Sequence, residues 1–391
     1  MRRLSWRLPE HVRFCLLAFL AGRVATSGIA VVAWHLSQAE PEPTTRWKAQ
    51  VPSNAWANAF AGFERFDAQW YLQLARDGYV DGDPSAAFFP LYPLLIRGLG
   101  TLLGDRWLLA ATLVSNAALI VALVLVYRLT TLVLSASAAR WTVVLLLLHP
   151  MALFLYAPYA ESLFLMLAAA CLLWLREGRW VPAALAASLA TATRSSGVVL
   201  CFAMAATALH EAGWWPAHAA AWKRLLARCG PVALSATGLL AYLAFWAAKG
   251  DWNAPLTTQR TAFFREPSWP WTAVLEGVQD LIGSVTEHGA LLMNGLAVLT
   301  VLTLLLTPRA VRRYGATNGA YVLGSIVMPL CLVRPYAPLT SVPRYYLVAF
   351  PVIWALVELT RRPAWRVVTV IVSGGALAVL TLLFARWHDV L

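Results

Sequence analysis

The chain has 391 residues, of which 60% are hydrophobic and only 13% are charged, and its mean hydropathy is +0.63. A soluble domain usually carries about a quarter charged residues, so the composition excludes a water-soluble enzyme. The apolar residues occur in long blocks, and a helix needs about 20 mostly apolar residues to cross the hydrocarbon core of a bilayer. The composition therefore predicts an all-α polytopic membrane protein.

The chain carries a formal net charge of +12, from 31 Lys and Arg against 19 Asp and Glu. Such a charge is typical of proteins that bind nucleic acid, but here the cations gather at the ends of apolar segments, where the positive-inside rule places them. We therefore expect membrane lipids, and no nucleic acid, as partners. Arg is far more frequent than Lys and Ala is abundant, which is typical of a high-GC bacterial genome.

The apolar runs predict about eleven membrane helices in one integral membrane domain that comprises residues 1–391. The predicted helices lie near residues 12–35, 106–130, 141–157, 161–175, 180–193, 196–210, 230–249, 288–306, 316–333, 343–360 and 365–385. Basic residues recur in alternate connections, beginning with Arg2, Arg3 and Arg7. This asymmetry predicts a multi-pass protein of a bacterial cytoplasmic membrane, with the N-terminus inside and the C-terminus outside.

Two long hydrophilic segments then fall on the extracytoplasmic side, namely residues 37–105 and 250–287. A third outer segment, Arg334–Arg344, is short and rich in proline. Within the first segment, Ala87–Gly104 is apolar but is interrupted by two prolines and one Arg. This pattern indicates a helix that lies in the membrane interface or re-enters it. The sequence thus predicts a long first outer loop that contains interfacial helices.

Several common catalytic and binding motifs are missing from the sequence. There is no G-x-x-x-x-G-K-[ST] phosphate loop, no G-x-S-x-G nucleophile elbow and no H-E-x-x-H pair. The seven histidines are dispersed, and the five cysteines include no C-x-x-C pair. These absences exclude a nucleotide loop of that kind, an α/β-hydrolase triad, a disulfide framework and a zinc site held by the protein.

The polar segment Ala61–Pro93 contains an acidic residue at the start of a predicted helix. Asp67, Trp70 and Tyr71 follow a spacing that puts them on one helix face. An Asp at a helix start is commonly an N-cap. The alternative is a general base held at the outer leaflet, where partial burial would raise its pKa toward a useful range.

Three further charged residues lie at the predicted outer ends of membrane helices. Glu161 follows A-P-Y-A at the start of a helix, where the helix dipole favours an anion, so capping is one interpretation. Arg194, in T-R-S-S-G, lies at a predicted helix break and either snorkels to the interface or binds a phosphate. Arg344, in S-V-P-R-Y-Y, is either an ordinary interfacial cation or a second phosphate ligand.

One outward-facing carboxylate and two arginines on the same predicted side of the membrane suit a glycosyl transfer from a lipid-phosphate donor. A base takes the acceptor proton, and cations stabilise the leaving phosphate. We therefore expect Asp67 to act as base or to orient the acceptor, and Arg194 and Arg344 to hold the phosphate. No cofactor is expected, because the arginines can neutralise a single phosphate without a metal ion. A requirement for a metal ion is not excluded, since Asp81 and Asp83 could supply carboxylate ligands.

Several motifs, in this order along the chain, resemble the PIG-V-like family, which includes GPI mannosyltransferase 2. They are R-F-D…G-Y…A-F-F-P-L-Y-P (Arg65–Pro93), P-x-x-x-F-x-x-A-P-Y-A-E-S-L-F (Pro150–Phe164) and T-R-S-S-G (Thr193–Gly197). The S-V-P-R-Y-Y stretch is similar to the terminal R-[FY] element of the family. The resemblance implies a GT-C-like bundle of transmembrane helices and a polyprenyl- or dolichyl-phosphate mannose donor.

The resemblance also implies site residues. The Asp of the family's R-W-D motif falls on Asp67, its Tyr-Ser-Glu element on Tyr159–Glu161, and its R-S-N-G element on Arg194–Gly197. The sequence departs from these motifs at Phe66, and also at Ala160 and Ser196. The residues expected to form the cleft for sugar, acceptor and lipid are Arg65, Trp70, Tyr71, Phe88, Phe89, Tyr159, Glu161 and Tyr345.

We therefore expect an inverting membrane mannosyltransferase that uses a polyprenyl-phosphate sugar donor and an extracytoplasmic glycan, glycolipid or protein acceptor. A transporter or flippase of a lipid-linked sugar is the alternative. Transporters often have discontinuous helices in both halves, but the sequence shows a broken pair only around Arg194. A non-catalytic membrane scaffold is a third reading, and it would not need polar residues clustered on one side.

Overall fold

The computed structural model describes residues 8–36, 45, 47–49, 53–283, 290–335, 338–339, 342–388 and 390. The N-terminal cations on which the predicted orientation depends, Arg2, Arg3 and Arg7, lie outside the described residues, as does Ser341 of the S-V-P-R-Y-Y stretch. The described part is helical apart from a single two-stranded sheet. The predicted all-α class is confirmed.

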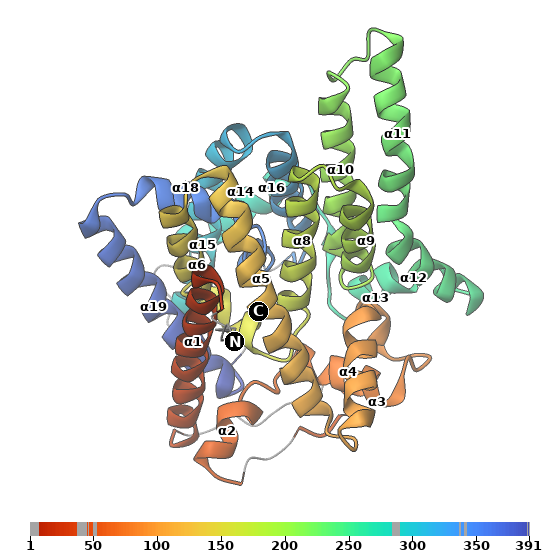
Figure 1. Ribbon diagram of the computed structural model, residues 1–391. Helices are drawn as coiled ribbons and strands as arrows, with labels where there is room; N and C mark the ends of the chain where they lie inside the picture. Colours follow the sequence, from red (N-terminus) through yellow and green to blue (C-terminus); the bar gives the residue numbers. More distant parts are fainter. Residues whose placement is uncertain are drawn as a thin grey trace, which may run out of the picture.

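Figure 1 shows the helices coloured in chain order. The first half of the chain contains α1 (Glu10–Trp34), α2 (Ala55–Ala61), α3 (Asp67–Asp77), η1 (Pro84–Ala87), α4 (Leu91–Leu102), α5 (Trp107–Val133), α6 (Ala136–Leu147), η2 (Pro150–Ala152), α7 (Leu153–Tyr156), α8 (Glu161–Arg176) and α9 (Trp180–Thr191). The second half contains η3 (Ser195–Gly197), α10 (Val198–Glu211), α11 (Ala219–Ser235), α12 (Thr237–Ala248), α13 (Ala254–Thr261), β1 (Glu266–Pro267), α14 (Pro270–Gly283), α15 (Ala290–Arg313), α16 (Ala316–Leu330), β2 (Leu332–Val333), α17 (Val342–Tyr346), α18 (Pro351–Leu359) and α19 (Pro363–Ala385).

Helix α8 lies at the centre of the bundle, where it packs against α5 and α9. Leu165, Ala168 and Cys171 of α8 are all fully buried, although they point in different directions around the helix. A helix that is apolar on every side is surrounded by other helices. The first residue of α8, Glu161, is therefore held inside the protein.

Fewer helices than predicted are long enough to cross a membrane. Among the described residues, four helices have the required length and composition, namely α1, α5, α19 and the Asn294–Arg313 part of α15, and the number rises to six if two bent pairs count as single spans. Each predicted segment contains a helix within the described part of the chain. The helical positions are thus as expected, while the predicted total of about eleven spans stays a prediction.

Prolines and a short loop interrupt several of the predicted helices. The predicted helix 141–157 is bent by 70° where η2 begins at Pro150, and the predicted helix 343–360 separates into α17 and α18, with Pro351 in the first turn of α18. A proline lacks the N–H of a helix interior and its ring clashes with the preceding turn. The predicted break at Ser195–Gly197 is present as η3, between α9 and α10.

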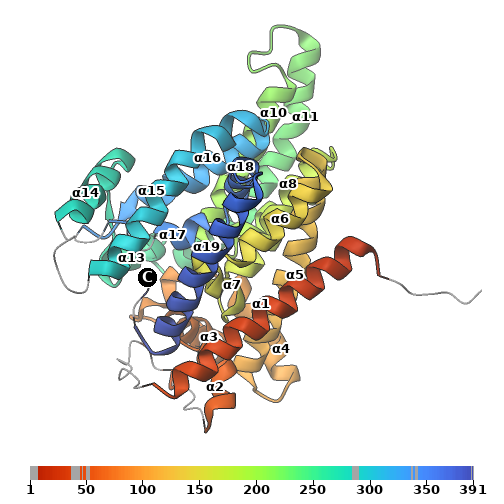
Figure 2. The same cartoon turned by 90° about the vertical axis from the view of Figure 1, so that its left-hand side faces the viewer.

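The two predicted outer segments meet in space. Helices α2, α3 and α4 of the first segment lie together at one end of the bundle, and the α10–α11 hairpin projects at the opposite end (Figure 1). Figure 2 shows α14, from the second segment, beside α15. Because α13 packs against η1, residues 37–105 and 250–287 share a common surface around the start of α3.

Helix α12 packs closely on α9 at Gly238, where a Cβ atom would overlap the carbonyl oxygen of Ser188 and lie 2.7 Å from Oγ1 of Thr191. We expect Gly238→Ala to destabilise the protein by about 1–3 kcal/mol, because overpacking forces the helices apart. In Gly230→Ala, the control in α11, the added Cβ meets nothing within 4 Å. Thermal unfolding in detergent, followed by circular dichroism, compares the two variants, and equal melting temperatures would contradict this packing.

Candidate active site

Four segments that are far apart in the sequence bring charged side chains to one point inside the bundle. Asp67 is the first residue of α3, and Glu161 is the first residue of α8. Arg194 immediately precedes η3, and Arg344 lies in the short helix α17. The sequence predicts these residues as separate charges at outer helix ends, and the structure joins all four in one network.

Arg344 links the two carboxylates. Its Nη1 donates to Oδ2 of Asp67 at 2.6 Å, and its Nε donates to Oε1 of Glu161 at 2.5 Å. Arg194 forms an ion pair with the same oxygen of Glu161. Glu161 is fully buried, and the exposed fractions of Arg344 and Arg194 are 6% and 9%. Charges as buried as these are stable only when paired, so the snorkelling reading of Arg194 and the interfacial reading of Arg344 are wrong.

Aromatic rings face both guanidinium groups. Cζ of Arg344 lies 4.7 Å from the ring centroid of Tyr159 and 4.8 Å from that of Phe154. Cζ of Arg194 lies 5.2 Å from the ring centroid of Tyr345. The negative face of an aromatic ring attracts a cation, most strongly where water is excluded. The rings therefore fix both arginines in position next to Glu161.

The charge of Arg344 is maintained by its neighbours. This residue lies in α17, outside the helices that are long enough to span a membrane. Burial lowers the pKa of Arg344, but the carboxylates of Glu161 and Asp67 outweigh burial and hold its pKa well above the ordinary value. The guanidinium is therefore permanently charged and can hold the Asp67 carboxylate in a fixed orientation.

Asp67 does not cap the helix that it begins. The N-cap position of α3 is Phe66, and within the described residues no side chain caps this end. Phe66 has φ of 51°, a left-handed conformation that bulky residues rarely adopt. Its ring packs on Phe384 and Trp387, with centroids 5.5 and 5.8 Å away, which holds the strained backbone in place. The capping interpretation of Asp67 is wrong, because its carboxylate accepts from Arg344 instead.

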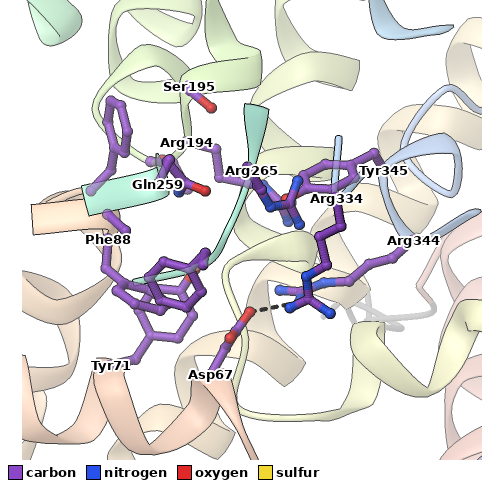
Figure 3. A pocket seen from close by; sticks show the side chains of 14 residues that line it. Asp67, Tyr71, Phe88, Arg194, Ser195, Gln259, Arg265, Arg334, Arg344 and Tyr345 are labelled. Carbon is purple, nitrogen blue, oxygen red and sulfur yellow. Dashed lines mark hydrogen bonds and ion pairs between the residues drawn. The ribbon is translucent and has the colours of Figure 1, made fainter. Parts of the chain in front are cut away.

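The network forms one wall of a cavity (Figure 3). Two of the predicted cleft residues lie behind this wall and do not line the cavity: Tyr159, whose hydroxyl donates to the carbonyl oxygen of Arg65 at 2.8 Å, and the fully buried Glu161. The predicted residues that do line the cavity are Asp67, Tyr71, Phe88, Phe89, Arg194, Arg344 and Tyr345.

Arg65 and Trp70 do not line the cavity, which corrects the expectation that they form its walls. They lie on either side of Asp67 in the sequence and pack behind it. The guanidinium of Arg65 donates to the carbonyl oxygens of Ala61 and Ala385, at 3.0 and 3.3 Å, and lies 4.3 Å from the ring centroid of Trp387. Trp70, in α3, is buried against Phe88, which follows η1, with ring centroids 5.7 Å apart. Both side chains are buried, Arg65 before the start of α3 and Trp70 within it.

Several residues that line the cavity carry no signal in the sequence. Arg265 comes from the second outer segment and Arg334 from the third, and only the long-range pairing of β1 with β2 brings them together. No local pattern predicts such a pairing. Gln259 and Phe263 also line the cavity and belong to no predicted motif, whereas the remaining lining residues, Ala87, Thr193 and Ser195, belong to the motifs that resemble the family.

Positive charge exceeds negative charge around the cavity. Four arginines line it, against the single carboxylate of Asp67 on its surface and that of Glu161 behind it. The positive charge also affects Tyr345, in α17. Burial raises the pKa of its hydroxyl, but the nearby arginines outweigh burial and lower this pKa below its ordinary value; they are Arg265, Arg194 and Arg344. A cavity of this kind favours an anionic ligand such as a phosphate ester.

The carboxylates that could hold a metal ion are engaged elsewhere. Among the residues that the structure describes, no group of three or more His, Cys, Asp or Glu side chains gathers in one place. Asp81 forms an ion pair with Lys249 at 2.8 Å, and Asp83 accepts from Nε2 of Gln73 and the backbone N–H of Ser85.

The fold is that of a polytopic membrane protein of the GT-C class. The chain is similar to ArnT from Cupriavidus metallidurans bound to undecaprenyl phosphate, with a TM-score of 0.50 and 13% identity over 88% of this chain and 59% of that one. An oligosaccharyltransferase from Archaeoglobus fulgidus, solved with zinc and sulfate, is similar at a TM-score of 0.46 and 13% identity, over 95% of this chain and 53% of that one. Residues 14–213, half of the chain, match the family described as mannosyltransferase (PIG-V). The protein belongs to this family, as the sequence motifs predict.

Characterised relatives match only part of the chain. It is 34% identical to GPI alpha-1,6-mannosyltransferase 2 of Rattus norvegicus over 148 residues, which are 35% of this chain and 30% of the relative. It is 29% identical to GPI mannosyltransferase 2 of Schizosaccharomyces pombe over 196 residues, 48% of this chain and 42% of the relative. The alignment thus spans less than half of either relative. The family match includes Asp67, Glu161 and Arg194, but ends before Arg344.

Glu161→Gln tests whether the buried network stabilises the fold. The substitution leaves two buried guanidinium groups beside a neutral amide, so we expect a loss of about 3–5 kcal/mol of stability. The control is Glu177→Gln, because Glu177 pairs with Arg128 and Arg179 at the surface, at 3.3 and 3.6 Å, and a surface pair contributes at most about 1 kcal/mol. Thermal unfolding in detergent compares the two, and a Glu161→Gln protein as stable as its control would show that the network is dispensable.

Proposed function

We propose that the protein transfers mannose from a polyprenyl-phosphate-linked donor to a glycan, glycolipid or protein acceptor on the extracytoplasmic side of the membrane. The observation that carries this proposal is the Asp67 carboxylate, held by Arg344 in the wall of an arginine-rich cavity. Membership of the mannosyltransferase (PIG-V) family supports the sugar. The undecaprenyl phosphate bound to the structurally similar ArnT supports an isoprenoid phosphate as carrier.

The proposed reaction is a single displacement at the anomeric carbon. The acceptor hydroxyl oxygen attacks C1 of mannose, the bond between C1 and the phosphate oxygen breaks, and its electron pair leaves with the phosphate. The hydroxyl proton passes to Asp67, so the products are the mannosylated acceptor and the polyprenyl phosphate. One displacement inverts the configuration at C1, and no second carboxylate is needed as a nucleophile. Arg344 holds the Asp67 carboxylate in the orientation that this proton transfer requires.

The lining of the cavity suggests how the donor is held. The arginines, with Arg194 and Arg344 among them, attract the donor phosphate and stabilise the charge that develops on it as it leaves. The aromatic side chains of Tyr71, Phe88 and Tyr345 offer faces against which a sugar ring can pack. Glu161 acts as a positioning residue, because it touches both arginines without lining the cavity.

The position of the basic loops supports an extracytoplasmic active site. Helix α19 has 23 residues, a length of about 35 Å, which is enough to cross the hydrocarbon core of a bilayer, about 30 Å thick. It begins after Arg361 and Arg362 and ends at Ala385, whose carbonyl oxygen accepts from Arg65 beside Asp67. Because basic loops stay in the cytoplasm, the active site lies on the other side. Residues 37–105 and 250–287 are then outer loops of one membrane domain, residues 1–391, in a bacterial cytoplasmic membrane.

Asp67→Asn tests the proposed reaction. The variant keeps the shape of the side chain but cannot accept the acceptor proton, so we expect transfer of radiolabelled mannose from polyprenyl-phosphate mannose to fall by about 100-fold or more. The control is Asp77→Asn, at the far, exposed end of the same helix, which should transfer at the wild-type rate. Transfer by Asp67→Asn at the wild-type rate would show that Asp67 has a structural role and is not the base. A wild-type protein that transfers no mannose would contradict the proposed activity.

A further inference from the structure

The short sheet β1–β2 places two arginines opposite each other. The strands are antiparallel, and Glu266 pairs with Val333. Arg265 precedes Glu266 and Arg334 follows Val333, so in this register the two arginines occupy the next opposing positions. Both line the cavity that contains Asp67. Figure 3 shows them entering the cavity from the side opposite to α3, which carries Asp67.

These two arginines differ from the other two in the cavity. Arg194 and Arg344 are paired with Glu161, and Arg344 also with Asp67. Within the part of the chain that the structure describes, neither Arg265 nor Arg334 forms an ion pair with a carboxylate, and the Nε of each is buried without a hydrogen-bond partner. The excess positive charge of the cavity therefore belongs to Arg265 and Arg334.

This arrangement is unfavourable for an empty cavity. Like charges at opposing positions of two strands destabilise a sheet, and a buried donor without a partner costs about 1–3 kcal/mol. The guanidinium of Arg265 is held in place over the ring of Tyr345, 5.4 Å from its centroid. A tetrahedral oxyanion placed between two guanidinium groups removes both penalties, because each planar group can donate two hydrogen bonds to it.

We infer that Arg265 and Arg334 form the cradle for the isoprenoid-linked phosphate of the sugar donor. This inference rests on the proposed function and assigns the direct hydrogen bonds of the phosphate to this pair, while Arg194 and Arg344 contribute positive charge to the cavity and, with Glu161, position Asp67. The arrangement puts the leaving phosphate on one side of the cavity and the carboxylate on the other. Inversion at C1 requires this separation, since attack and departure occur on opposite faces of the sugar.

Binding of farnesyl phosphate to the purified full-length protein in detergent tests the inference. We expect Arg265→Gln and Arg334→Gln each to weaken binding by about 10-fold or more, because each removes a charge-assisted contact. The control is Arg260→Gln, because Arg260 lies in the last turn of α13, is exposed and does not line the cavity. It should bind as the wild type does, and inorganic phosphate should compete with farnesyl phosphate in both.

Thermal unfolding without ligand gives a second, independent readout. Removing one of two facing positive charges should leave the melting temperature of Arg265→Gln and Arg334→Gln unchanged or higher, while the stabilisation by farnesyl phosphate seen in the wild type is lost. Lower melting temperatures in both variants, with stabilisation by farnesyl phosphate retained, would show a structural role and overturn the inference. Should one glutamine variant fail to fold, its lysine counterpart keeps the charge without the planar fork and should show weakened but measurable binding.

Three results separate this inference from the proposed function. Binding of farnesyl phosphate through both arginines, without any transfer of mannose, supports the cradle and refutes mannosyl transfer. Mannose transfer by Arg265→Gln and Arg334→Gln with an unchanged KM for the donor supports the activity and refutes the cradle. Equal competition by phosphatidylglycerol would show that the pair binds bulk lipid headgroups, which also refutes a cradle for the donor.

Discussion

The buried carboxylate of Glu161 is the interaction on which the rest of the site depends. It lies fully inside the protein at the first turn of the central helix α8, where water cannot solvate it. Two guanidinium groups must therefore come to it, and each comes from a segment that is not a long helix: Arg194 from the α9–η3 break and Arg344 from the short α17. The Nη1 of Arg344 remains free to donate a second hydrogen bond, which the carboxylate of Asp67 accepts.

The same dependence explains why helices are broken around the site. Irregular backbone is tolerated at membrane depth only where it is buried in protein or lines a cavity. Pro150 bends the chain between α6 and α7, and Pro351 separates α17 from α18. These breaks bring the turns that carry Glu161 and Arg344 into the bundle, so several helices are shorter than a bilayer is thick.

Local sequence signals predicted where two of the helices begin and which charged side chains lie there. Asp67 begins α3 and Glu161 begins α8, as the patterns indicate, and the break at Arg194 is present. The partners of these charges could not be predicted, because Arg344 lies 183 positions from Glu161 and 277 from Asp67, and even Arg194 lies too far from Glu161 to leave a local periodicity. A cap and an ion-paired carboxylate also have the same sequence signature at a helix start. Only the tertiary structure shows which of the two roles a given carboxylate has.

Hydropathy predicted where apolar segments lie, but not how they are divided. The predicted helix 343–360 contains apolar residues on both sides of Pro351, so an average over a window runs across the break. Arg265 and Arg334 show a different limit. Each is an ordinary arginine in an outer segment, and their shared position arises from a sheet of two residues per strand, which is too short to leave an alternating pattern.

The bond between Arg65 and Ala385 joins positions 320 residues apart, and it has a consequence for biogenesis. The guanidinium beside Phe66 and Asp67 completes its contacts only with the carbonyl at the end of α19 and the ring of Trp387. A nascent chain emerges from the ribosome N-terminus first, so the R-F-D turn is synthesised long before these partners exist. The strained turn can therefore reach its final contacts only after α19 and Trp387 have been synthesised.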